Sequence, residues 1–190
     1  FWLSYIDALI KVKQLGHTKA MLDLAKIRGA KGDALDKFAE RLLGVEPAAI
    51  AVFENQDPPR EKFQPIFNLY SQGSLQRTLD EVLQLLPQFP SSVILYSILG
   101  AANAGLGQFD AAIQAYKKAV TLNPINANLY YNMAVAFQDH AKLEEAIESY
   151  KKAIAIKPNY AEAYNNMGNS LKEQDKPEEA IEAYNKALTI

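Results

Sequence analysis

The feature that most constrains the fold is a repeat of 34 residues in the second half of the chain. A column of small residues, Gly100, Ala134 and Gly168, recurs at this spacing. Five further columns recur in the same register: Tyr96, Tyr130 and Tyr164; Ala112, Ala146 and Ala180; Tyr116, Tyr150 and Tyr184; Ala119, Ala153 and Ala187; Pro124 and Pro158. A period of this length is typical of a solenoid, in which each unit buries its apolar face against its neighbours.

Each unit is interpreted as a hairpin of two packed helices. Gly168 falls inside a predicted helix, where Gly costs about 1 kcal/mol relative to Ala. Close approach of the paired helices explains this residue, because small side chains let the backbones come together while Tyr and aliphatic side chains pack around them. Pro177 suits the first turn of a second helix, and Pro124 and Pro158 mark breaks between units. The turns inside the hairpins are predicted at 105–110, 140–143 and 174–177.

These columns together resemble the tetratricopeptide repeat (TPR), a helix hairpin of 34 residues. Residues 93–126, 127–160 and 161–190 match it at nearly every signature position, and the last unit lacks its final few residues. The resemblance implies an all-α fold, a right-handed TPR superhelix in which helix hairpins are stacked as an α-solenoid.

The register weakens toward the N-terminus but persists. Residues 59–92 keep Gly73 at the turn and Pro90 at the closing position, and are interpreted as a degenerate TPR. Ile66 and Thr78 replace the two small residues, so we expect this hairpin to pack less tightly.

An N-terminal helical piece is predicted at residues 1–44, a divergent, repeat-like hairpin in which Ala8 and Ala20 keep the 12-residue spacing. Residues 45–58 are the predicted linker, because this proline-containing stretch shows no sustained period. Neither end resembles a natural terminus, so the chain is interpreted as a fragment of a longer protein.

Composition excludes several classes of partner. The chain has 20 Lys and Arg residues against 22 Asp and Glu residues, a net charge of −2, and therefore lacks the basic excess of nucleic-acid binders. No run approaches the roughly 18 apolar residues that span a bilayer. Cysteine is absent, which fits a reducing compartment, so we expect a cytoplasmic protein. The charge balance and the lack of a spanning segment predict that it binds neither nucleic acid nor membrane.

Catalysis is not expected in this chain. His17 and His140 fall at predicted turns without metal-ligand spacing, and no nucleophile elbow or phosphate loop occurs. We therefore predict no enzyme activity, no cofactor and no metal. Acidic pairs such as Glu144–Glu145 are expected in the first turns of second helices, where they favour the helix dipole. Lys152 is expected near the end of the same helix, paired with Glu148 at i,i+4.

The candidate site is the face of the first helices that would line the concave groove. Helical spacing and the TPR resemblance place polar side chains there, and the predicted peptide-binding residues are Asn128, Tyr131, Asn132, Gln138, Asn165, Asn166 and Asn169. Asn132 and Asn166 match positions of the Asn ladder in the TPR superhelices of O-linked N-acetylglucosamine transferases. Such side chains both donate and accept, and therefore suit an extended peptide backbone.

The basic clamp by which some TPRs hold acidic C-termini is not expected. The matching positions hold Ser97, Ala101, Asn132, Glu162 and Asn166, so only Asn132 fits and Glu162 has the wrong sign.

Three functions remain open at this stage. The first is a protein–protein interaction module that binds a peptide or partner segment in the groove. The second is the substrate-recruiting N-terminal region of a larger bacterial transferase, of glycosyltransferase or sulfotransferase type, which the resemblance to O-GlcNAc-transferase-like arrays implies. The third is a self-assembly scaffold, a homo-oligomer formed through the exposed solenoid end.

Overall fold

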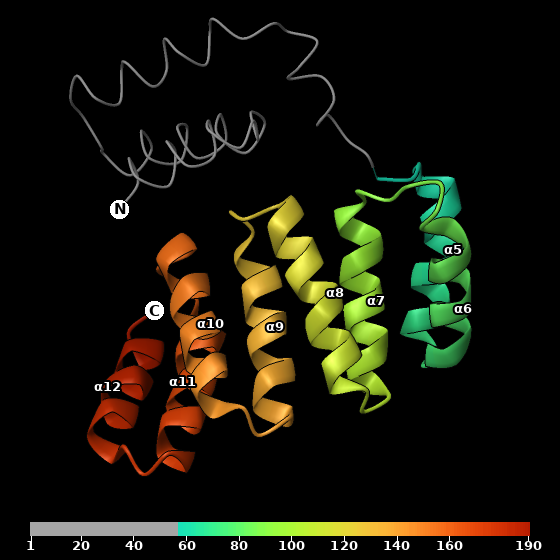
Figure 1. The fold of residues 1–190 in the computed structure, drawn as a ribbon. Coiled ribbons are helices and arrows are strands. Elements are labelled where there is room, and N and C mark those ends of the chain that lie inside the picture. The colour runs from blue at the N-terminus through green and yellow to red at the C-terminus, as the bar shows by residue number, and fades with distance from the viewer. Residues whose placement is uncertain (1–56) are drawn as a thin grey trace, which may run out of the picture. The chain divides into compact units, whose positions relative to one another are not determined.

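The computed structural model describes residues 57–190, which form one compact unit. All regular structure in this part of the chain is α-helical, as predicted (Figure 1). The helices are α5 (Arg60–Ser71), α6 (Leu75–Leu85), α7 (Val93–Gly105), α8 (Phe109–Leu122), α9 (Ala127–Asp139), α10 (Leu143–Ile156), α11 (Ala161–Glu173) and α12 (Pro177–Leu188). The predicted N-terminal hairpin 1–44, with His17, and nearly all of the predicted linker 45–58 lie outside the described residues.

The helices pair into hairpins that follow one another in chain order, α5–α6, α7–α8, α9–α10 and α11–α12 (Figure 1). The first helices α5, α7, α9 and α11 contact one another in succession. The second helices α6, α8, α10 and α12 make no such contacts with each other within residues 57–190. The stack therefore curves, with the first helices on its inner, concave side and the second helices spread along its outer, convex side.

The turns inside the hairpins fall where the sequence predicts them. In each hairpin one turn residue adopts the left-handed conformation: Gly73 (φ 72°), Gly107 (φ 73°), Ala141 (φ 55°) and Asp175 (φ 58°). These residues form one further column at the 34-residue spacing. Only two of the four are glycine, the residue that adopts this conformation without steric cost.

The small-residue column is explained by a tyrosine ring. A Cβ added at Gly100 would lie 2.7 Å from Cε1 of Tyr116, and one added at Gly168 would lie 2.6 Å from Cε1 of Tyr184. The close approach predicted from the sequence is therefore made by the second-helix tyrosine, which lies 16 residues further on, against the backbone of the first helix.

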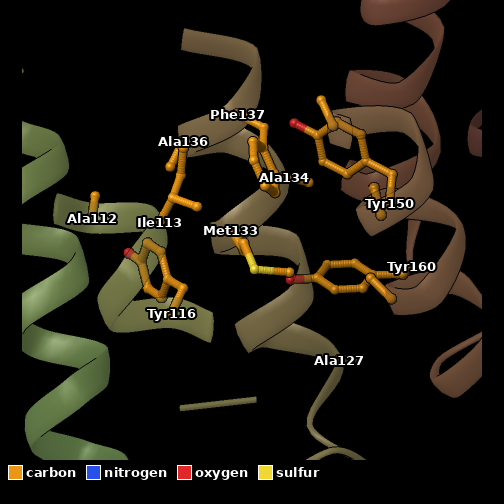
Figure 2. Packing of buried hydrophobic residues seen from close by; sticks show 13 residues of the cluster. Ala112, Ile113, Tyr116, Ala127, Met133, Ala134, Ala136, Phe137, Tyr150 and Tyr160 are labelled. Atoms are coloured by element: carbon orange, nitrogen blue, oxygen red, sulfur yellow. The ribbon is translucent and has the colours of Figure 1, made fainter. Parts of the chain in front are cut away.

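The largest core cluster joins α8, α9 and α10 (Figure 2). Ile113 and Tyr116 of α8 lie to one side of α9, and Tyr150 and Tyr160 lie to the other. The Tyr150 side chain is fully buried. Tyr116 and Tyr150, which belong to one repeating column, are therefore core residues at the contacts between hairpins.

The first described hairpin is the loosest of the four. Ile66 and Thr78, which replace the small residues, are both buried, and Thr78 Oγ1 donates to the Ser74 carbonyl oxygen at 3.0 Å. Pro65 lies inside α5, where it cannot donate a helical hydrogen bond. The weaker sequence register thus coincides with weaker packing.

Charges at the helix ends follow the prediction only in part. Glu144 and Glu145 lie in the first turn of α10. Lys152, expected near the end of this helix, lies before its last turn, because α10 continues to Ile156. Glu148 pairs with Lys151 at i,i+3, with 3.6 Å between Oε1 and Nζ, and the pairing expected with Lys152 was wrong.

Candidate functional site

All seven predicted groove residues belong to α9 and α11, the two first helices that contact each other nearest the C-terminal end. Asn128 and Asn165 are exposed, and the others are half-buried. The fold thus presents uncharged hydrogen-bonding side chains from two neighbouring helices.

Two of these asparagines are held by tyrosines across the interface between hairpins. The Tyr160 hydroxyl donates to Asn128 Oδ1 at 3.0 Å, and Asn166 Nδ2 donates to the Tyr131 hydroxyl at 3.0 Å. Each bond uses one half of a side-chain amide. Such bonds fix the orientation of the amides before any ligand arrives.

Two further groove residues hold tyrosines of the second helices. Gln138 Oε1 accepts a hydrogen bond from the Tyr150 hydroxyl at 2.9 Å, and Asn169 Oδ1 accepts one from the Tyr184 hydroxyl at 2.8 Å. The buried Tyr150 hydroxyl and the partly buried Tyr184 hydroxyl thus have hydrogen-bond partners among the predicted groove residues. Replacing Gln138 or Asn169 would therefore affect the core as well as the groove.

Tyr131 is the centre of an aromatic cluster at this interface. Its ring is stacked on that of Tyr160, with centroids 5.0 Å apart and an interplanar angle of 29°, and lies 5.9 Å from the Tyr150 ring. Burial raises the pKa of the Tyr131 hydroxyl, and the nearby Glu162 carboxylate raises this pKa further, against the opposing effect of the Asn166 hydrogen bond. The phenol is therefore neutral at physiological pH.

Three of the predicted residues meet at one cavity. Tyr131, Asn165 and Asn166 line a space of about 550 Å³ between α9, α11 and α12, together with Ala161, Glu162, Tyr184, Ala187 and Leu188. Asn128, Asn132, Gln138 and Asn169 lie outside this lining. The cavity is thus polar at the asparagines, apolar along α12, and carries one carboxylate.

A polar cluster between the α7–α8 and α9–α10 hairpins was missed from the sequence. Asp110 Oδ1 lies 3.0 Å from Lys142 Nζ and 3.2 Å from His140 Nε2, and the His140 ring lies 5.7 Å from that of Phe109. The hydrogen bond and positive charge of Lys142, with a smaller contribution from His140, lower the pKa of Asp110. His140 falls at a predicted turn, but this contact was not predicted from the sequence. The available signal was that Asp110 and Lys142 fall in adjacent predicted turns.

Residues 57–190 contain no group of three His, Cys, Asp or Glu side chains placed to hold a metal ion. None of the helices described there has the length and apolar character that crossing a bilayer requires.

Comparison with known families finds TPRs in the C-terminal half. A family model described as TPR repeat matches residues 100–140 and 142–175, and one described as tetratricopeptide repeat matches residues 161–190. These matches confirm the repeat type inferred from the 34-residue columns.

Solved structures of MamA have a similar fold. A crystal structure of MamA gives a TM-score of 0.66 at 24% identity, covering 88% of this chain and 92% of that chain. A MamA chain described as 41-end, from Desulfovibrio magneticus RS-1, gives 0.65 at 22% identity, covering 93% of each chain. At these identities the likeness shows the fold alone, a TPR solenoid. A search of curated proteins found no match.

Proposed function

We propose that this chain is a protein–protein interaction module that binds an extended peptide along the concave surface of its first helices. The TPRs and the solenoid fold fit such a module. The observation that supports the finer proposal is the pair of neighbouring helices α9 and α11, which carry seven uncharged hydrogen-bonding side chains, none of them fully buried. The proposed module is not catalytic.

The chemistry of these side chains suits a peptide backbone. An asparagine amide offers one acceptor and two donor hydrogens, which complement the N–H and C=O groups of an extended chain without reading its side chains. Asn166 keeps its Oδ1 acceptor after donating to Tyr131. In this proposal Asn132 and Asn166 bind the backbone, while the cavity beside Tyr131 receives one ligand side chain.

Binding of extended peptides tests this proposal. An array of extended 12-residue peptides of varied sequence identifies a probe, and fluorescence anisotropy with the 190-residue chain then measures its affinity. The double variant Asn132→Ala, Asn166→Ala should weaken binding at least tenfold, the loss expected for about two hydrogen bonds, and leave helical circular dichroism unchanged. The matched control is Asn185→Ala, on the exposed part of α12. Equal affinities of the double variant and the control would contradict the proposal.

Self-association through the C-terminal end of the solenoid is a second candidate. Three large apolar residues on and just after α12 are exposed: Ile181 by 58%, Leu188 by 84% and Ile190 by 52%. Covering such side chains removes apolar surface from water and would favour association. Sedimentation velocity over a range of concentrations should show a dimer that Leu188→Gln weakens. A monomer at all concentrations would exclude this candidate.

A substrate-recruiting role in a larger transferase would use the same groove. The spacing of Asn132 and Asn166, one repeat apart, is the feature that supports this version of the proposal. The intact mass of the protein in its source cells distinguishes the two versions, since a transferase requires a mass well above 21.1 kDa. Fractionation of the same cells tests the proposed cytoplasmic, bacterial setting.

A further inference from the structure

A second groove lies on the convex side of the solenoid, between α6 and α8, with α7 as its floor. It has a volume of about 460 Å³, and Leu79, Leu83, Leu99 and Asn103 are among its lining residues. The groove exists because the second helices do not contact one another, so the intervening first helix is left partly uncovered between them. It is separate from the concave residues of α9 and α11.

The floor of this groove lacks an apolar side chain that the following repeats possess. Asn103 occupies the position that Phe137 and Leu171 hold one and two repeats later, and all three residues are buried, with 6%, 7% and 4% exposed. The Asn103 amide is tied to its own helix, because Nδ2 donates to the Leu99 carbonyl oxygen at 2.8 Å. The repeats thus show what normally fills this position, namely an apolar side chain of the size of Leu or Phe.

The rim of the groove also differs from the following repeats. Four rim positions that are charged in both later repeats are uncharged here. Leu83 stands where the later repeats have Lys117 and Lys151, and Gln108 stands where they have Lys142 and Lys176. Ala111 stands in the place of Glu145 and Glu179, and Gln114 in the place of Glu148 and Glu182. The loss of all four charges at a single groove matches an uncharged occupant.

Leu83 shows the difference most directly. In the next repeat Lys117 places its Nζ 5.9 Å from the centroid of the Phe137 ring, so a charge and a ring cover the equivalent floor. Leu83 instead is 55% exposed beside Asn103. An apolar side chain brought from outside would cover Leu83 and occupy the place of the missing ring.

We infer that this convex groove binds an amphipathic helix of a partner protein, which inserts a Leu or Phe and is uncharged on the inserted face. The lining residues of α7 at the two ends, Tyr96 and Asn103, are seven positions apart in the helix, or about 10 Å and two helical turns. A helix lying along them would therefore use anchors at i and i+3 or i+4. Recognition is apolar, so the affinity should vary little with salt concentration.

Selection of hydrocarbon-stapled helical peptides on the 190-residue chain tests this inference. The probe is the best binder from a library with two randomised positions at i and i+4 in a neutral Ala and Gln background. The selected anchors should be Leu or Phe, and Leu83→Lys should weaken anisotropy-measured binding at least tenfold. Gln84→Lys is the matched control, because it adds the same charge one position along α6 at a residue outside the groove lining.

Two further variants keep the test decisive. Asn103→Leu should fill the groove as Leu171 does, abolishing peptide binding while preserving or raising the melting temperature. Asn132→Ala with Asn166→Ala should leave the helical peptide bound, which separates this inference from the concave-groove proposal. Selection of charged anchors, or equal binding by Leu83→Lys and the wild-type chain, would overturn the inference of a convex docking groove. So would self-association of the wild-type chain that Leu83→Lys abolishes, because the occupant would then be a second copy.

Discussion

At the scale of single residues, the turn position that adopts positive φ in each hairpin is strained wherever it is not glycine. Gly73 and Gly107 adopt positive φ freely, whereas Ala141 adopts φ 55° with a Cβ that approaches its own carbonyl oxygen. This conformation costs a non-glycine residue roughly 1 kcal/mol. The turn geometry is set by the hairpin, so the residue identity changes the stability and leaves the fold unchanged.

Ala141→Gly should therefore stabilise the chain. Relief of the left-handed strain is expected to raise the free energy of unfolding by about 0.5–1 kcal/mol, or about 2–4 °C in melting temperature for a chain of this size. Differential scanning calorimetry measures this shift. Gly107→Ala is the reciprocal control and should lower the melting temperature; a lower melting temperature for Ala141→Gly would contradict the argument.

Gly168→Leu should destabilise the last hairpin by overpacking. The new side chain would meet the Tyr184 ring, 2.6 Å from the position of its Cβ, so a loss of about 1–3 kcal/mol is expected. Thermal unfolding followed by circular dichroism detects this loss. Gly168→Ala should have the smaller effect, because Ala134 occupies the same column in the preceding hairpin. An unchanged melting temperature of Gly168→Leu would contradict this prediction, because the Tyr184 side chain would then move aside without loss of stability.

At the scale of elements, neighbouring hairpins are joined by a few polar contacts as well as by the core. Asp110, which lies in the first turn of α8, reaches Lys142 and His140 in the turn between α9 and α10. The low pKa of Asp110 means that its ionised form is stabilised in the folded chain. Because the pKa is lower in the folded than in the unfolded state, this stabilisation is present at neutral pH and is lost as the pH falls below about 4.

Asp110→Asn should thus lower the melting temperature slightly at pH 7, and the decrease should shrink as the pH falls below about 4 and the native carboxyl takes up a proton. The decrease should be small because exposed ion pairs are screened by solvent. Melting curves of both chains between pH 3 and pH 7 provide the measurement. If Asp110→Asn lowered the melting temperature equally at pH 3 and pH 7, the loss would come from altered packing rather than from the lost charge.

At the scale of the whole unit, stability should vary along the stack. A solenoid unit is stabilised by its own hairpin and by its neighbours, so units with two tight neighbours are held best. The largest core cluster lies between α8 and α10, whereas α12 ends with exposed Leu188 and the α5–α6 hairpin packs loosely.

Amide hydrogen exchange should follow this order. We expect the slowest exchange in α8, α9 and α10 and faster exchange in α12 and α5, because local opening is easier where fewer apolar contacts are lost. Exchange measured by mass spectrometry on the 190-residue chain resolves these segments. Uniform protection from α5 to α12 would indicate a single cooperative unit instead.

Most of the fold could be predicted from the sequence because a TPR hairpin is a local structure. The 34-residue columns, the small residue before each tyrosine and the prolines between units all act within about one repeat, and they predicted the helices and turns of residues 93–190. The charge pairs were less predictable. Glu148 has a lysine at both i+3 and i+4, and the side-chain rotamers decide whether it pairs with Lys151 or with Lys152.

The candidate sites depended much more on tertiary structure. The sequence alone determined which face of α9 and α11 is polar, since helical spacing places Asn132 and Asn166 in equivalent positions. Only the stacking of hairpins decided that Tyr131 and Tyr160 hold two groove amides, that Asp110 bridges two turns, and that Asn103 leaves a convex groove open. The physical reason is that a periodic sequence specifies each unit, whereas the space between units depends on how the second helices spread and on which side chains fill the gap.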